Sequence, residues 1–223
     1  MIESTAGIIL RTRPLTETSL IVHWLTRDWG RLATVAKGAR RPRSPFLGQL
    51  DLFYVADFSF SRSRRSDLHV LREVAVREIH SALRADLLRL RGAAYAAALV
   101  EQATEAETPL PAVHDLLLGY LERLCHKPAP PQLVFAFELK FLHELGLGPA
   151  PQKTSLTPGA IQIVHALTRN DWPACSRLRL SEAQKAELRR FLHGFLVFHL
   201  GRLPRGRAAA LAQPGGEDTL KIA

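Results

Sequence analysis

The hydrophobic pattern of this chain changes its period once, near residue 78, and that change limits the folds open to it. Before residue 78, apolar residues alternate with polar ones in short runs, as in strands with one buried face. After it, apolar residues recur every three to four positions in longer runs rich in Ala, Leu, Glu and Arg, as in amphipathic helices. Strands followed by helices predict an α+β chain, with a β domain ahead of an all-helical one.

Five strands are expected before residue 78, separated by segments rich in Gly, Pro, Ser and Asp. They cover residues 7–13, 19–26, 31–37, 52–61 and 69–76. In the fourth, alternate residues from Leu52 to Phe60 are apolar or aromatic, which is typical of a half-buried strand. Five short strands fit a small closed antiparallel barrel. The five-stranded OB-fold barrel is the commonest version that binds nucleic acid, and an SH3-like barrel would give a similar pattern.

Helical periodicity continues from about residue 84 to residue 201. The expected helices cover residues 84–107, 112–127, 132–145, 158–170 and 181–201. Thr157 ahead of Pro158 is a typical N-cap, and Ser181 with Gln184 has the form of a capping box. The chain after Arg207 is expected to be poorly ordered. The predicted parts are an OB-fold nucleic-acid-binding domain at 1–79, a helical domain at 80–212 and a flexible tail at 213–223.

The segment 37–45 is strongly basic and should be an exposed loop. Pro42 and Pro45 prevent a helix or a central strand from running through it. Its cations are Lys37, Arg40, Arg41 and Arg43. Such a loop can present charge to a polyanion, although basic residues in surface loops are often merely solvated. Further cations that could guide the phosphates of a strand are Arg11, Arg13, Arg62, Arg64 and Arg65.

The overall charge favours partners that carry phosphates or acidic tails. The formal net charge is +9 and the isoelectric point is about 10.2. Residues 1–80 carry 13 basic against 8 acidic residues, residues 81–150 carry 6 against 8, and residues 151–223 carry 11 against 5. The two basic regions could converge on one ligand or bind two. The C-terminal basic residues are Arg177, Arg179, Arg189, Arg190, Arg202, Arg205 and Arg207. Of these, Arg205 and Arg207 are expected to contact a second DNA strand.

The sequence contains no familiar catalytic or cofactor-binding motif. Its nine histidines are scattered singly, and Cys125 and Cys175 are too few for a disulfide framework or a four-thiolate zinc site. Asp51 and Asp57 could suggest a metal-dependent nuclease, but turn capping and solvent exposure explain them equally well. We therefore expect no enzyme activity, no metal and no cofactor.

No run approaches the roughly 20 apolar residues of a membrane helix, and the first residues lead us to expect no secretory leader. We expect a soluble cytoplasmic protein without a membrane partner. The sequence does not determine the oligomeric state, for which a monomer is the simplest expectation.

Two residues have expected roles that depend on the predicted elements. In the helix at 132–145, Glu138 falls in the middle of an apolar arc. A buried carboxylate is costly, so Glu138 should either pair with an arginine from a neighbouring element or accept hydrogen bonds from backbone donors, and we expect it to act as a structural link between domains. Trp29, in the turn between the second and third strands, is the best candidate for stacking on a base. The alternative for Trp29 is packing over one end of the barrel.

Several short segments follow one another in a specific order along nearly the whole chain. They are G-I-I-L-R from Gly7, E-T-S from Glu17, T-x-x-x-G from Thr26, A-K-G-A-R from Ala36, L-x-L-F from Leu50, F-E-L-x-F-L-x-E-L-G from Phe137 and H-L-G from His199. In this order they resemble the bacterial RecO family of recombinational DNA repair proteins. The resemblance implies an N-terminal OB-fold barrel, a helical C-terminal domain and binding to single- and double-stranded DNA. It also implies annealing of complementary strands and, with RecR, loading of RecA onto strands coated by single-strand-binding protein (SSB).

The resemblance further implies two protein partners, RecR and the acidic C-terminal tail of SSB. A groove between the helices at 132–145 and 181–201 would suit that tail, with Phe141 or Phe195 as its apolar part and Arg189 and Arg190 at its edge. An alternative function is therefore a protein-interaction adaptor that contacts DNA only incidentally.

The sequence departs from the family pattern at one place. Many members carry a Cys-x-x-Cys zinc module after a G-L-x-P turn, whereas here the turn at 146–149 leads into a segment without cysteine. We therefore expect the zinc module to be absent.

Overall fold

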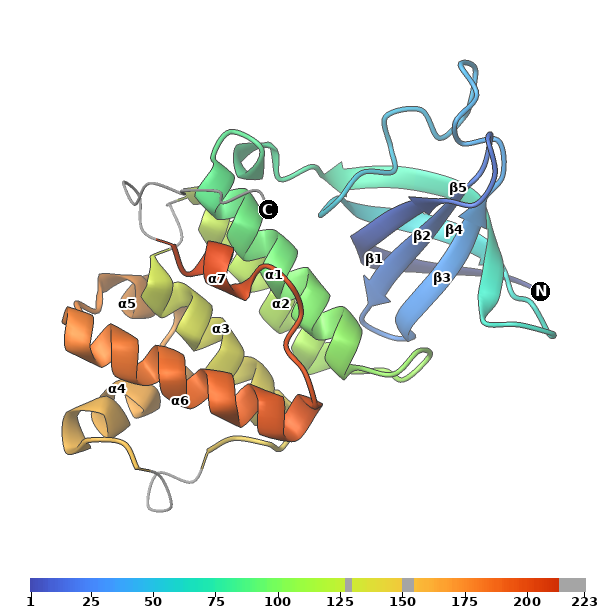
Figure 1. The fold of residues 1–223 in the computed structure, drawn as a ribbon. Helices are drawn as coiled ribbons and strands as arrows, with labels where there is room; N and C mark the ends of the chain where they lie inside the picture. The colour runs from blue at the N-terminus through green and yellow to red at the C-terminus, as the bar shows by residue number, and fades with distance from the viewer. Residues whose placement is uncertain (127–129, 150–154, 213–223) are drawn as a thin grey trace, which may run out of the picture. The chain divides into compact units, whose positions relative to one another are not determined.

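The computed structural model describes residues 1–126, 130–149 and 155–212 (Figure 1). The expected flexible tail at 213–223 and most of the segment in place of the zinc module lie outside these residues. The chain divides into two compact units. The first comprises Met1–Ser81 with Ala97–Glu122, and the second comprises Ala82–Ala96 with the chain from Arg123 onward.

The first unit contains a closed five-stranded barrel. Its strands are β1 (Ile2–Pro14), β2 (Leu20–Thr26), β3 (Gly30–Ala36), β4 (Val55–Ser61) and β5 (Leu68–Glu78). They follow the order β1-β2-β3-β5-β4 and close through β4 and β1. Neighbours are antiparallel except β3 and β5, which run parallel. This is the strand order of the OB-fold, so the expected fold class is confirmed and the SH3-like alternative is wrong.

The barrel core is built from the inward faces of the strands. Trp24 is fully buried, stacks on Phe58 with ring centroids 4.1 Å apart, and donates from Nε1 to Thr34 Oγ1 at 2.9 Å. The expected alternation is present in β4, where Ala56, Phe58 and Phe60 are buried. The strand begins at Val55 instead of residue 52, because Phe53 has a φ of 65° and turns the chain there.

The remaining named elements of the described chain are helices. They are the 3₁₀ helix η1 (Ser81–Leu83) and the α-helices α1 (Leu87–Ala103), α2 (Pro111–His126), α3 (Pro131–Glu144), α4 (Pro158–Arg169), α5 (Trp172–Arg177), α6 (Glu182–Leu200) and α7 (Arg207–Ala210). Within the described residues, no helix combines the length and the apolar character needed to cross a membrane.

Helix α1 ends at Ala103, short of the expected end at residue 107, because the chain then follows the barrel. Arg31 Nε donates to the Thr104 carbonyl at 3.0 Å, and the backbone N–H of Glu107 donates to the Arg31 carbonyl at 2.9 Å. A Cβ on Gly30 would lie 2.0 Å from the carbonyl oxygen of Thr108, so glycine is required there. The segment 104–108 is therefore fixed against the barrel by its backbone.

In the second unit, the expected helix starts are confirmed. Thr157 accepts a hydrogen bond from Ala160 N at the start of α4, and Ser181 and Gln184 form the complete capping box of α6. Helix α3 has ten buried residues, and α4, α5 and α6 pack against it. The apolar arc predicted for α3 is thus the centre of this unit.

Helices α5 and α7 do not follow from the sequence pattern. Asp171 caps α5 by accepting from Ala174 N at 2.7 Å. Helix α7 follows Gly206, whose φ of 98° favours glycine. The expected disorder after Arg207 is wrong for residues 208–212, because Ala210 and Leu211 are buried.

Candidate nucleic-acid interface

The basic loops expected to bind DNA lie at opposite ends of the barrel. The strand register places the β1–β2 turn (15–19) and the long connection 37–54 at one end. The β2–β3 turn (27–29) and the β4–β5 loop (62–67) are at the other end (Figure 1). A seven-residue strand such as β3 rises by about 3.3 Å per residue, so the two ends are about 20 Å apart. The two loops therefore form separate candidate surfaces.

The basic loop 37–45 is an ordered series of turns. Ala39 within it and Phe46 just after it are buried in the barrel core. Arg40 is also tied to the β1–β2 turn, because its backbone N donates to Thr18 O at 3.0 Å and its Nη1 donates to Thr16 O at 3.2 Å. The exposed cations are Lys37, Arg40, Arg41 and Arg43. Because the backbone is already fixed, this loop would lose little conformational freedom on binding a polyanion.

Arg11 and Arg13, both on β1, have different surroundings. Arg11 Nη2 pairs with Glu101 Oε1 at 2.8 Å, and His23 Nδ1 lies 3.3 Å from the same oxygen. Burial lowers the pKa of His23, Glu101 opposes that shift, and Arg11 and Arg13 add to it. Arg13 is exposed. Arg13 can therefore bind a phosphate directly, whereas Arg11 would have to exchange Glu101 for it.

At the other end of the barrel, Arg62 and Trp29 contact one another. The guanidinium carbon of Arg62 lies 5.4 Å from the centre of the Trp29 ring. Trp29 is half-buried, packs against the barrel core and meets Phe60 edge-on at 5.9 Å. Trp29 therefore packs over one end of the barrel, which was the alternative to base stacking. Arg62 covers one face of the ring, so a base could stack there only if Arg62 moved.

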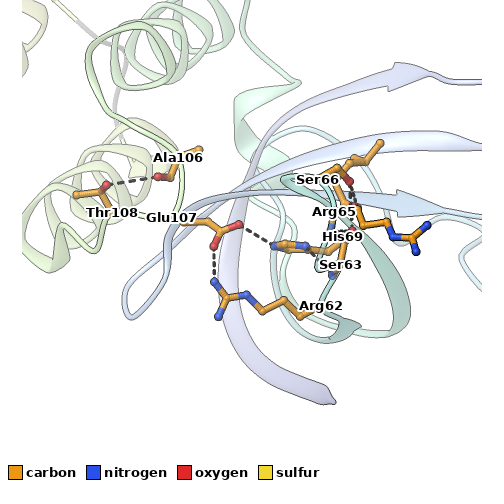
Figure 2. Close-up of polar contacts among 9 residues, drawn as sticks. Arg62, Ser63, Arg65, Ser66, His69, Ala106, Glu107 and Thr108 are labelled. Carbon is orange, nitrogen blue, oxygen red and sulfur yellow. Dashed lines mark hydrogen bonds and ion pairs between the residues drawn. The ribbon is translucent and has the colours of Figure 1, made fainter.

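Arg62, Arg64 and Arg65 share a loop that is anchored on a buried histidine. Ser63 N donates to His69 Nδ1 at 3.3 Å, and Arg65 N donates to Ser63 Oγ at 3.3 Å (Figure 2). Arg64 and Arg65 are exposed, whereas Arg62 also pairs with Glu107 at 2.6 Å. The loop therefore presents two exposed arginines and a third that already has an anionic partner.

Glu138 has the structural role expected of it, but within one unit. It is fully buried and forms two hydrogen bonds with Arg207, from Nε to Oε1 at 2.6 Å and from Nη2 to Oε2 at 2.9 Å. Tyr95 Oη also donates to Glu138 Oε1, at 2.6 Å. The arginine partner is confirmed. The predicted link between domains is wrong, because α1, α3 and α7 contribute these residues within the second unit.

The buried cluster excludes Arg207 from the candidate DNA-binding residues. Its side chain is 8% exposed, and its Nη1 donates to the Arg189 carbonyl at 3.3 Å. Burial alone would lower the pKa of Arg207, but the hydrogen bond and charge of Glu138 outweigh it and raise the pKa. Burial, together with the charge of Glu138, raises the pKa of Tyr95. Arg207 is thus a permanent cation enclosed by the fold.

The expected partner groove is displaced from Phe141. Phe141 is fully buried and lies beside Phe137 in the helical core, so it cannot line a groove. Phe195 is half-buried between Phe191 and His199. A groove of about 540 Å³ lies instead between α6 and the segment 203–211. It is lined by Arg189, Arg190, His193, Leu203, Pro204, Gly206, Arg207, Ala208 and Leu211.

Comparison with known proteins identifies the family. The family descriptions "Recombination protein O N terminal" and "Recombination protein O C terminal" match residues 1–80 and residues 84–155 with 150–208, respectively. The chain belongs to the RecO family. It is 29% identical to the DNA repair protein RecO of Exiguobacterium sibiricum over 208 residues, covering 91% of this chain and 82% of that protein. It is 28% identical to the DNA repair protein RecO of Bacillus subtilis over 207 residues, covering 91% and 80%.

Membership of the RecO family places the chain among the mediators of DNA repair and recombination, which are not enzymes. The resemblance seen in the order of the sequence motifs is thereby confirmed. The general partners of RecO family proteins are DNA, RecR and SSB. The cationic surfaces described above are therefore on a protein whose family works on DNA.

Features that could suggest metal chemistry have structural explanations in this RecO family member. Asp51 accepts from the backbone N–H of Leu52 at 2.7 Å, and Asp57 pairs with Arg77 at 2.5 Å. Burial raises the pKa of the Cys175 thiol, which lies inside the second unit. Within residues 1–126, 130–149 and 155–212, no three His, Cys, Asp or Glu side chains are grouped to hold a metal ion.

Sequence reasoning does not single out Glu101, Thr104 or Glu107, yet each binds an arginine of the barrel. Their partners are Arg11, Arg31 and Arg62, respectively. The only sequence signal is indirect: three glutamates occur between residues 101 and 107, in the weakly acidic middle of the chain. The arginine that each residue binds depends on where the end of α1 and the segment 104–108 lie against the barrel. The local sequence pattern does not show this.

Proposed function

We propose that this chain is a recombination mediator of the bacterial cytoplasm that binds single- and double-stranded DNA without sequence specificity. In this proposal it also anneals complementary strands and, with RecR, helps load RecA onto SSB-coated DNA. The observation that carries the proposal is the ordered cationic loop 37–45 at one end of an OB-fold barrel. Family membership supports it, because relatives across nearly the whole chain are named DNA repair proteins.

The cations of this loop suit the DNA backbone more than its bases. Phosphate contacts fix a strand in place without reading sequence, and Lys37, Arg41 and Arg43 supply exposed charges for them. Arg13, at the same end of β1, extends the surface. Residues 1–79 would thus act as the nucleic-acid-binding domain, and residues 80–212 as the helical domain that supplies other contacts.

The salt dependence of DNA binding tests this proposal. If the loop and Arg13 neutralise about five phosphates, the logarithm of the affinity for single-stranded DNA should fall with the logarithm of salt concentration, with a slope near −3.5. Fluorescence anisotropy of a labelled oligonucleotide, titrated at several salt concentrations, measures this slope. An affinity that does not change with salt, or DNA cleavage that EDTA abolishes, would contradict the proposal.

A second cationic surface on the helical unit would account for annealing. Its exposed arginines are Arg177, Arg179, Arg189, Arg190, Arg202 and Arg205. A second strand bound there would be screened from the first, so their mutual repulsion would be reduced. We therefore propose that Arg205, but not the buried Arg207, takes part in this surface.

Charge reversal at Arg190 and Arg205 tests the second surface. The double variant Arg190→Glu/Arg205→Glu should slow annealing of complementary oligonucleotides several-fold more than it weakens binding to one strand, because only annealing requires both surfaces. Arg169→Glu, an exposed arginine at the end of α4, is the control. Annealing would be followed by fluorescence energy transfer between labelled strands. Equal losses in both assays would argue against two surfaces.

The protein-interaction adaptor is the second candidate function, and the groove beside α6 favours it. The groove has an apolar part from Leu203, Pro204 and Leu211 and is edged by Arg189 and Arg190. An acidic peptide ending in apolar residues, such as the C-terminal tail of SSB, would match both features. We propose that this groove, and not the surroundings of Phe141, takes the SSB tail.

A further inference from the structure

Glu107 holds together a polar cluster at the end of the barrel that carries the β4–β5 loop. Figure 2 shows its carboxylate between Arg62 and His69. Oε2 accepts from Arg62 Nη2 at 2.6 Å, and Oε1 lies 3.2 Å from His69 Nε2. Arg62 and His69 belong to the barrel, whereas Glu107 belongs to the segment after α1. One carboxylate from outside the barrel therefore faces two of its nitrogen donors.

The carboxylate leaves one of these donors unsatisfied. His69 is 1% exposed, and Ser63 N–H donates to its Nδ1, so Nδ1 is the acceptor and the ring hydrogen lies on Nε2. Nε2 faces Glu107 Oε1, but the contact lacks hydrogen-bond geometry. A buried N–H without an acceptor is unfavourable. An anion with its oxygens arranged differently from those of Glu107 would satisfy His69 better.

The backbone at Glu107 keeps the carboxylate near the barrel while its side chain stays movable. Glu107 has a φ of 53°, which is unusual for a residue with a Cβ, and its N–H donates to Arg31 O at 2.9 Å. These constraints act on the main chain and not on the carboxylate. Rotation of the Glu107 side chain can therefore release Arg62 without moving the segment 104–108.

Arg62 covers an aromatic surface in the same cluster. Its guanidinium lies over the Trp29 ring at 5.4 Å and is held there while it pairs with Glu107. Trp29 is fixed from below by the barrel core. When Arg62 turns toward another anion, the covered face of Trp29 becomes accessible to a planar group.

We propose that Arg62, His69 and Trp29 form a nucleotide subsite that Glu107 closes in the unbound protein. A DNA phosphate takes the place of the Glu107 carboxylate at His69, Arg62 turns off the Trp29 ring toward that phosphate, and the adjoining base stacks on the face of Trp29 that Arg62 uncovers. A base that stacks on a side chain must be unpaired, so the subsite takes single-stranded DNA. It rests on the proposed DNA binding and makes Glu107 an internal competitor that lowers DNA affinity.

The variant Glu107→Gln tests the competition. Glutamine keeps the length of the side chain and an oxygen toward His69, but it lacks the charge that competes with phosphate. Asp57→Asn is the matched control, because it also removes a barrel-bound carboxylate that pairs with an exposed arginine, Arg77. Binding of labelled oligothymidylate would be measured by anisotropy over a range of salt concentrations.

We expect Glu107→Gln to tighten binding about fivefold more than Asp57→Asn does. Its log–log salt slope should become steeper by about 0.7, the value for one further phosphate on a single strand. The gain should disappear in Glu107→Gln/Arg62→Gln and should be reduced for an abasic oligomer of equal length, which has phosphates but no bases. If Glu107→Gln does not fold by circular dichroism, Glu107→Asp, whose side chain is one methylene shorter and so pairs less well with Arg62, provides a second test and should also tighten binding.

Other results of these measurements would contradict either the subsite or the proposed DNA binding. Equal affinities for Glu107→Gln and Asp57→Asn, weaker binding by a folded Glu107→Gln, or a gain that persists without Arg62 would overturn the subsite while leaving the proposed DNA binding intact. An equal gain with abasic DNA would overturn the role of Trp29. If the unmodified protein binds no DNA at any salt concentration, the proposed function itself is overturned.

Discussion

Replacing Lys37, Arg40, Arg41 and Arg43 together with glutamine is expected to weaken binding to single-stranded DNA by on the order of 100-fold at 0.1 M salt. Each phosphate contact with a single strand contributes about 0.7 to the log–log salt slope, so the slope should become shallower by about 2 to 3. Arg40 contributes least to this change, because its Nη1 already donates to the Thr16 carbonyl. Anisotropy titrations with a labelled oligonucleotide at several salt concentrations measure both quantities.

Two controls make this result specific. Arg72 and Arg77 are exposed cations on β5, so Arg72→Gln/Arg77→Gln changes the net charge of the barrel away from the loop. That variant should change the log–log salt slope by less than the value of about 0.7 expected for one phosphate contact. The loop variant should also keep its affinity for an acidic peptide, because the groove beside α6 is elsewhere in the chain. An unchanged slope in the quadruple variant would show that DNA binds through other residues.

The barrel strands could be predicted from sequence because the pattern that marks each strand lies within the strand itself. Period-two alternation in β4 and β-branched runs in β2 and β3 mark strands without reference to distant residues. Phe53 does not fit the alternating pattern of the strand. Its positive φ turns the chain away from strand geometry, and its side chain is nevertheless buried. Helix starts were predictable for the same reason, since a cap such as Ser181 acts within one turn.

The candidate site was less predictable because charge in sequence does not show which charges are already neutralised. Arg62 and Arg207 look alike in sequence, as arginines in basic segments, but Arg62 pairs with Glu107 at the surface and Arg207 pairs with Glu138 in the core. The register also separates the two basic loops by the length of the barrel, which their positions along the sequence do not show. Both facts depend on long-range packing.

The largest effect on stability is expected from Glu138→Gln. The substitution leaves the Arg207 guanidinium buried without a compensating charge, and breaking a buried pair in this way typically costs about 3 to 5 kcal/mol. Tyr95→Phe removes one hydrogen bond to the carboxylate but leaves the ion pair, so it should cost about 1.5 to 3 kcal/mol. Urea unfolding followed by circular dichroism gives the free energy of unfolding of each variant.

A double replacement separates the cost of an unpaired charge from the value of the pair. Replacing both partners, as in Glu138→Leu/Arg207→Met, removes the ion pair without leaving a buried charge, so the double variant should be more stable than Glu138→Gln alone. This order would mean that the pair positions α7 against α1 and α3 more than it stabilises the fold. A loss of less than about 1 kcal/mol in Glu138→Gln would contradict the buried geometry, since an uncompensated buried guanidinium cannot be that inexpensive.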